Sequence, residues 1–112
     1  MVIIINKPPR VFSVGFDNEI KISDCGRIKL QPNEQVTFIE NEKEYDVAKK
    51  DWGFYATPSI NGRLKSFGYK TALVINSVGK YYVMIVEEEK IEIFEEYILS
   101  EKSSVVQWLD EK

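Results

Sequence analysis

The residues best suited to bind a ligand lie close together in the middle of the chain. Residues 51–70 read DWGFYATPSINGRLKSFGYK, so aromatic rings are mixed with glycines, hydroxyls, an amide and cations. Aromatic side chains provide flat apolar walls, glycines let a backbone approach closely, and polar groups fix the orientation of a ligand. The mixture predicts a small-molecule pocket. The candidate ligand-binding residues are Trp52, Tyr55, Ser59, Asn61, Arg63 and Lys65.

The same segment predicts a preference for anions. Thr57 followed by Pro58 is typical of a helix start, and the apolar spacing that follows predicts a short helix over 58–67. The free N–H groups of residues 59–61 would then lie at a helix N-terminus, where phosphate and carboxylate bind. Arg63 could pair with such an anion through its guanidinium fork. A sugar phosphate or nucleotide sugar fits this arrangement, although no P-loop or dinucleotide-binding motif occurs.

A structural interpretation of these residues stays open beside the functional one. In it, the apolar side chains form part of the core, the glycines set turns and the cations are only solvated. The core would then take up Trp52, Phe54, Ile60, Leu64 and Phe67.

The composition narrows the possible chemistry. The chain has no histidine and a single cysteine, Cys25. This excludes Ser-His-Asp and Cys-His catalysis, histidine-based metal sites and an internal disulfide. Cys25 has no histidine base and is interpreted as a structural or incidental thiol. We expect no cofactor, no metal site and no catalytic residue; an enzyme acting on the same ligands, using Asp51, Tyr55 or a glutamate, is the alternative.

Charge is distributed unevenly along the chain. Residues 47–83 hold six basic groups and one acidic group, whereas residues 84–112 hold three basic and nine acidic groups. The glutamates of the last third fall along one predicted helix, so we interpret them as a solvated face. The acidic last third and the pI near 5.1 argue against nucleic acid as a partner, because binding depends on neutralising phosphates.

The first half of the chain predicts short antiparallel strands. Turn residues recur every eight to ten positions, at 17–18, 24–26, 32–33 and 41–43, and Pro8-Pro9 is expected to end the first strand. The expected strands cover residues 2–5, 11–16, 20–22, 28–30, 36–39 and 45–47.

The second half adds helices to the sheet. Residues 69–75 and 80–86 predict a hairpin, residues 88–100 a longer C-terminal helix, and residues 105–109 a last strand. The expected fold is α+β and β-rich, with a mostly antiparallel sheet arranged as a meander, or as a small barrel or sandwich. We expect a single domain over residues 1–112, since no linker or repeat occurs.

The strand at residues 2–5 is wholly apolar and uncharged. At an open sheet edge such a strand would pair with another chain, so it is either buried within one subunit or used in a homodimer. No apolar run is long enough to span a membrane, and no export signal is evident, which favours a soluble cytoplasmic protein.

The sequence therefore supports three functions. The leading hypothesis is a non-catalytic binding or accessory protein for an anionic small molecule. The alternatives are a small enzyme acting on the same ligand class, and a protein-interaction or homodimerisation module.

Overall fold

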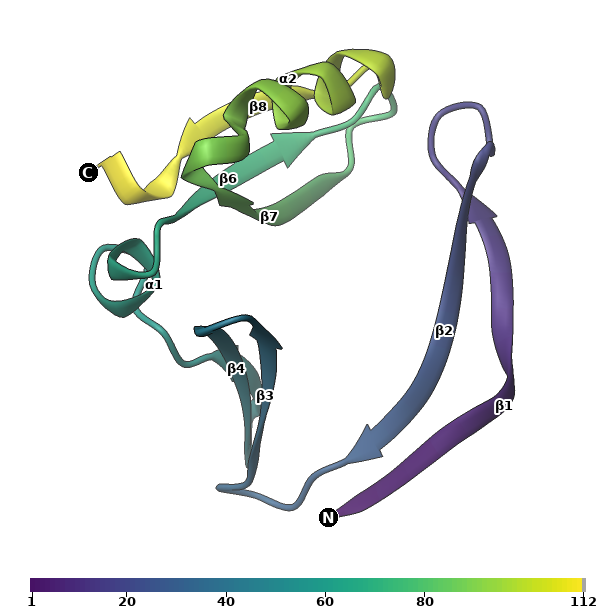
Figure 1. Cartoon of the computed structure of the whole chain (residues 1–112), viewed down its shortest axis with the longest axis vertical. Helices are drawn as coiled ribbons and strands as arrows, with labels where there is room; N and C mark the ends of the chain where they lie inside the picture. Colours follow the sequence, from purple (N-terminus) through teal and green to yellow (C-terminus); the bar gives the residue numbers. More distant parts are fainter. Residues whose placement is uncertain (112) are drawn as a thin grey trace. The chain divides into compact units, whose positions relative to one another are not determined.

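The computed structural model describes residues 1–111 and contains three separate antiparallel sheets (Figure 1). The first is a two-stranded ribbon of β1 (Val2–Val14) and β2 (Ile20–Lys29). The second has the order β3-β4-β5, with β3 at Gln35–Glu40, β4 at Lys43–Lys50 and β5 at Gly53–Ala56. The third has the order β7-β6-β8, with β6 at Tyr69–Ile75, β7 at Tyr81–Glu87 and β8 at Ser104–Trp108.

Two α-helices accompany the sheets. The short α1 spans Arg63–Ser66 and the longer α2 spans Ile91–Ser100, with 3₁₀ turns η1 at Glu88–Lys90 and η2 at Leu109–Glu111. The predicted α+β, β-rich, antiparallel fold with a short central helix and a longer C-terminal helix is confirmed. Within residues 1–111, no helix combines the length and apolar character needed to cross a membrane.

The chain groups into two compact units. The first unit contains Met1–Phe38 and Asp46–Thr57, and the second contains Ile39–Tyr45 and the chain from Pro58 onward. The tip of the β3-β4 hairpin thus belongs to the second unit. That the whole chain forms one domain remains a prediction from the sequence.

The second unit has a small apolar core beneath α2. Ala72 and Val74 of β6 and Ile98 of α2 are buried together, and Phe94 and Trp108 pack against them. The helix covers one face of the β7-β6-β8 sheet (Figure 1), and the Phe94 and Trp108 rings meet edge to face at 5.7 Å. Phe94 and Ile98 are therefore the residues through which α2 packs on the sheet.

A buried carboxylate ties the C-terminus to β6. Asp110 is 3% exposed, and its Oδ1 accepts a hydrogen bond of 2.9 Å from the backbone N–H of Thr71. The Lys70 ammonium lies 2.9 Å from Asp110 Oδ2 and 2.7 Å from Glu111 Oε2. Burial, the largest single influence, raises the pKa of Asp110, but the bonds from Thr71 and Lys70 together outweigh it and lower that pKa.

The β1-β2 ribbon departs from the prediction at two places. Residues 24–26 were expected to turn, but they continue β2 in an extended conformation. Pro8 and Pro9 were expected to end the first strand, but β1 continues through them to Val14. Both expectations are wrong. The two prolines lie in a bulge of β1, where residues 6–9 lie opposite Cys25 alone, and regular pairing with β2 resumes at Arg10.

Candidate functional site

The predicted helix start at Thr57-Pro58 is wrong. α1 begins at Arg63, and residues 59–62 form a turn before it, closed by the Gly62 N–H donating to the Ser59 carbonyl at 3.2 Å. The Ser59 Oγ accepts a hydrogen bond of 3.1 Å from the Arg63 backbone N–H. A Cβ on Gly62 would lie 2.2 Å from Ser59 Oγ, so glycine permits this tight turn. The N–H groups of residues 59–61 therefore do not form a helix N-terminus.

The four polar candidates lie in the second unit. Ser59, Asn61, Arg63 and Lys65 are all exposed. The Arg63 guanidinium lies 3.8 Å from a carboxylate oxygen of Glu44, and the Lys65 ammonium lies 3.5 Å from the backbone oxygen of Asp110. Acceptors of the chain itself thus already face both cations.

The two aromatic candidates lie in the first unit, at the β4-β5 turn. The Trp52 and Tyr55 rings stack with centroids 5.9 Å apart and planes inclined by 28°. Trp52 is 71% exposed, and Phe54 beside it is also exposed. The alternative that placed Trp52 and Phe54 in the core is therefore wrong, whereas it is confirmed for Leu64, which is fully buried. The six candidates are divided between the two units.

Anion binding at these residues remains a prediction from the sequence, and thermal shift tests it. If Arg63 and Lys65 hold an anion, sugar phosphates or nucleotides will raise the melting temperature, because a ligand that binds only the folded state stabilises it. Arg63→Ala should remove that increase, while Arg27→Ala in the other unit should keep it. An increase that survives Arg63→Ala, or none with any phosphate, contradicts the prediction.

The most unusual surface lies on the β1-β2 ribbon, and the sequence indicated only part of it. Residues 2–5 were singled out as an apolar strand, and all four are about half exposed, as Ile3 is at 56%. Further exposed apolar residues on the ribbon were missed, because their partnership with β1 depends on strand register. These are Val11, Phe12, Ile22 and Ile28.

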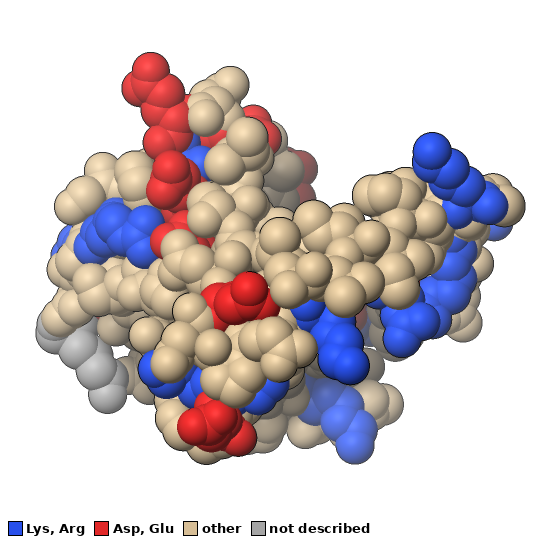
Figure 2. All heavy atoms as spheres, turned by 90° about the horizontal axis from the view of Figure 1, so that it is seen from below, with Lys and Arg blue, Asp and Glu red and all other residues tan. Residues whose placement is uncertain are grey.

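Strand register gives this end of the ribbon two different faces. Directly opposed residues point to the same face, and neighbours along a strand alternate. Ile3 lies opposite Ile28, which makes one face purely apolar. On the other face, Ile4 lies opposite Arg27 and Val2 lies opposite Lys29. We call this second set, Val2, Ile4, Arg27 and Lys29, the mixed face. Figure 2 shows Lys and Arg side chains among uncharged residues over the ribbon.

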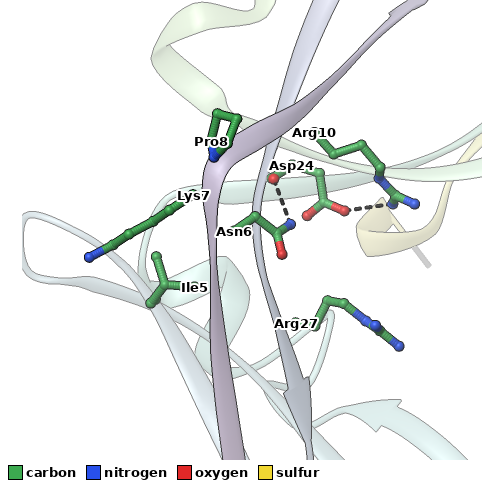
Figure 3. A pocket seen from close by; sticks show the side chains of 7 residues that line it. All are labelled: Ile5, Asn6, Lys7, Pro8, Arg10, Asp24 and Arg27. Carbon is green, nitrogen blue, oxygen red and sulfur yellow. Dashed lines mark hydrogen bonds and ion pairs between the residues drawn. The ribbon is translucent and has the colours of Figure 1, made fainter.

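The bulge creates a shallow concavity of about 440 Å³ on the ribbon (Figure 3), and its lining residues are Ile5, Asn6, Lys7, Pro8, Arg10, Asp24 and Arg27. The Asn6 amide donates a hydrogen bond of 2.8 Å to the Asp24 carbonyl oxygen, and the Arg10 guanidinium lies 2.6 Å from the Asp24 carboxylate. In the view of Figure 3, Lys7 extends to the opposite side of the ribbon from Arg10 and Arg27. These contacts hold the two strands together where their regular pairing is interrupted.

A second concavity, of about 540 Å³, lies in the second unit beside α1 and η1. Lys43 lines it, and its ammonium lies 3.2 Å from a Glu87 carboxylate oxygen and 5.0 Å from the centre of the Tyr69 ring. The Lys43 and Lys90 ammonium groups flank Glu87, and their hydrogen bonds, with that of Lys90 the stronger, lower its pKa. Among residues 1–111, no three Cys, Asp or Glu side chains cluster closely enough to hold a metal ion.

Apolar side chains are exposed on the second unit as well. Ile93 and Tyr97 lie on the side of α2 that does not face its core, and Tyr81 and Val83 lie on the edge strand β7. Both units therefore present apolar surface, and the ribbon presents the longest stretch of it. Comparison with known protein families, curated proteins and solved structures finds no match for this chain.

Proposed function

We propose that this protein is a self-associating module, and that the β1-β2 ribbon binds a second copy of the chain. The observation that carries the proposal is a ribbon that has two strands in the described part of the chain and whose apolar residues are exposed on both faces. This is the protein-interaction function that the uncharged strand at residues 2–5 indicated as an alternative.

The low stability expected of an isolated two-stranded ribbon supports this proposal. A two-stranded hairpin is at best marginally stable in water, and it becomes stable when a third strand or another apolar surface packs against it. Within residues 1–111, β1 pairs only with β2, and each strand therefore has one unpaired edge. At residues 2–5 of β1 that edge carries no charge to discourage pairing with another strand.

A triple variant of the ribbon tests the proposal. Ile3→Thr, Ile4→Thr and Ile5→Thr together keep the β-branched shape that favours strands but make the exposed side chains more polar. We expect the wild-type protein to associate in a concentration-dependent way, and the variant to associate at least about tenfold more weakly, since about 1.4 kcal/mol of lost burial suffices. Sedimentation velocity and light scattering measure the dissociation constant.

The matched control is Val78→Thr, which makes the same kind of change at a side chain that is 74% exposed in the β6-β7 loop. It should associate like the wild-type protein. A wild-type chain that stays monomeric at every concentration would overturn the proposal. So would a triple variant that keeps its circular dichroism spectrum and associates as strongly as the wild-type protein.

A further inference from the structure

The surface of α2 that faces away from the core combines apolar and acidic side chains. Ile93 and Tyr97 are four residues apart and share one side of the helix, and Ile93 is 65% exposed. Glu92 and Glu96, also four residues apart, adjoin them on the same outward side. All four side chains are exposed. We call this set the acidic face of α2.

The mixed face of the ribbon has the opposite charge and the same kind of pattern. Arg27 and Lys29 flank the apolar Val2 and Ile4, and all four are exposed. Among residues 1–111, neither these two cations nor Glu92 and Glu96 take part in an ion pair. Each face thus has charges available to a partner.

The spacing of the charges also agrees. Arg27 and Lys29 are two residues apart on an antiparallel strand, which separates them by about 6.8 Å. Glu92 and Glu96 are four residues apart on a helix, which separates them by about 6 Å along its axis. A strand laid along the helix can therefore form both ion pairs at once, with Ile4 and Val2 against Ile93 and Tyr97.

We propose that the mixed face of the ribbon in one copy binds the acidic face of α2 in another copy. The inference rests on the self-association proposed above and names the two surfaces that meet. Contact between unlike faces uses two different surfaces of each chain, so the association is heterologous.

The charges on the two faces determine whether a face binds an unlike or a like face of another copy. Two mixed faces in contact would bring four cations together, and two acidic faces would bring four carboxylates together. Like charges opposed across an interface are destabilising, whereas opposite charges favour association and set its register. The unlike pairing is therefore the favoured one, and added salt should weaken it by screening.

Two charge-reversed full-length chains test the inference. The first carries Arg27→Glu and Lys29→Glu, and the second carries Glu92→Lys and Glu96→Lys. Each alone should associate about tenfold more weakly than the wild-type protein, because two attractive pairs become repulsive. An equimolar mixture should regain near wild-type association, since each altered face now meets its opposite charge. The chain that combines all four substitutions should also regain it.

Two single reversals outside these residue sets serve as controls. Lys21→Glu lies at the other end of the ribbon, beyond the bulge and opposite Ser13, and Glu95→Lys lies on α2 outside the acidic face. Both should associate like the wild-type protein. Circular dichroism confirms that every variant keeps its fold.

The outcomes separate this inference from the proposed function. If the Thr triple variant weakens association but the charge-reversed chains associate normally, or their mixture does not recover, the ribbon binds elsewhere and this inference is wrong. If the wild-type chain is monomeric, both proposals fail. Recovery in the mixture, with loss in each chain alone, supports both.

Discussion

Replacing Asp110 by alanine should lower the free energy of unfolding of the protein by about 3 kcal/mol. The substitution removes the acceptor of the buried Thr71 N–H and leaves the Lys70 ammonium without its buried partner. The Thr71 N–H then remains buried without an acceptor, which is the costly part of breaking such a cluster, while Lys70 keeps its ion pair with the more exposed Glu111 carboxylate. Urea denaturation followed by Trp108 fluorescence, in a Trp52→Phe background, measures the change.

Two variants calibrate this result. Asp110→Asn keeps an oxygen that can accept from Thr71 but removes the charge, so its loss should be intermediate. Glu111→Gln removes the other carboxylate near Lys70, but that side chain is largely exposed, so its effect should stay below about 1 kcal/mol. An Asp110→Ala protein as stable as Glu111→Gln would show that the cluster contributes little.

The pH dependence provides the same test without loss of packing. The folded-state pKa of Asp110 is lowered, so the contribution of its carboxylate to the free energy of unfolding is fully present above the unfolded-state pKa of about 4. That contribution is lost as the pH falls through the folded-state value. The stability difference between the wild-type protein and Asp110→Asn should therefore shrink below about pH 4.

Ile98→Ala should cost about 2–5 kcal/mol of unfolding free energy, whereas Ile93→Ala on the same helix should change it by less than about 0.5 kcal/mol. Ile98 is 7% exposed and packs with Ala72 and Val74, so its truncation leaves a cavity in the core. Ile93 points away from that core. Chemical denaturation of both variants measures the difference.

The same pair of variants separates folding from association. Ile93→Ala should weaken self-association while leaving stability nearly unchanged, because Ile93 belongs to the acidic face of α2. Equal losses of stability in the two variants would contradict the packing described for α2. Unchanged association of Ile93→Ala would count against the proposed contact but not against the core.

The fold from β6 onward could be predicted from the sequence because its signals are local and strong. β6 matches its predicted range, and β7 and β8 lie within one residue of theirs. Continuous apolar runs separated by a turn around Gly79 define the hairpin, and the Glu-rich amphipathic stretch defines α2. Here the local preferences and the tertiary packing agree.

The first half was harder because tertiary context decides its local structure. The turns predicted around Asn18 and Asn41 are present, and both asparagines adopt left-handed backbone angles there. Gly26 also looked like a turn residue, yet it remains in β2 because it allows close approach to the Ile4 carbonyl, which a Cβ would meet at 2.8 Å. Composition alone cannot distinguish a glycine that turns the chain from one that lets two strands approach.

The proposed interaction surface was only partly predictable for a related reason. The uncharged run at residues 2–5 is visible in one stretch of sequence. The mixed face, in contrast, joins Ile4 to Arg27 across more than twenty positions, and only the strand register reveals it. The acidic helix residues were correctly expected to be exposed, but their match to a basic strand becomes apparent only when both faces are known.

The proline bulge of β1 limits how far an added strand could extend along the ribbon. Pro8 and Pro9 have no N–H to donate, and residues 6–9 lack regular pairing, so the regular edge is divided into Val2–Ile5 and Arg10–Val14. Fibril-forming cross-β stacks are built from uninterrupted segments of about six or seven residues. Each part of this edge is shorter than that. We therefore expect the bulge to allow a chain with so much exposed apolar surface to associate without forming amyloid.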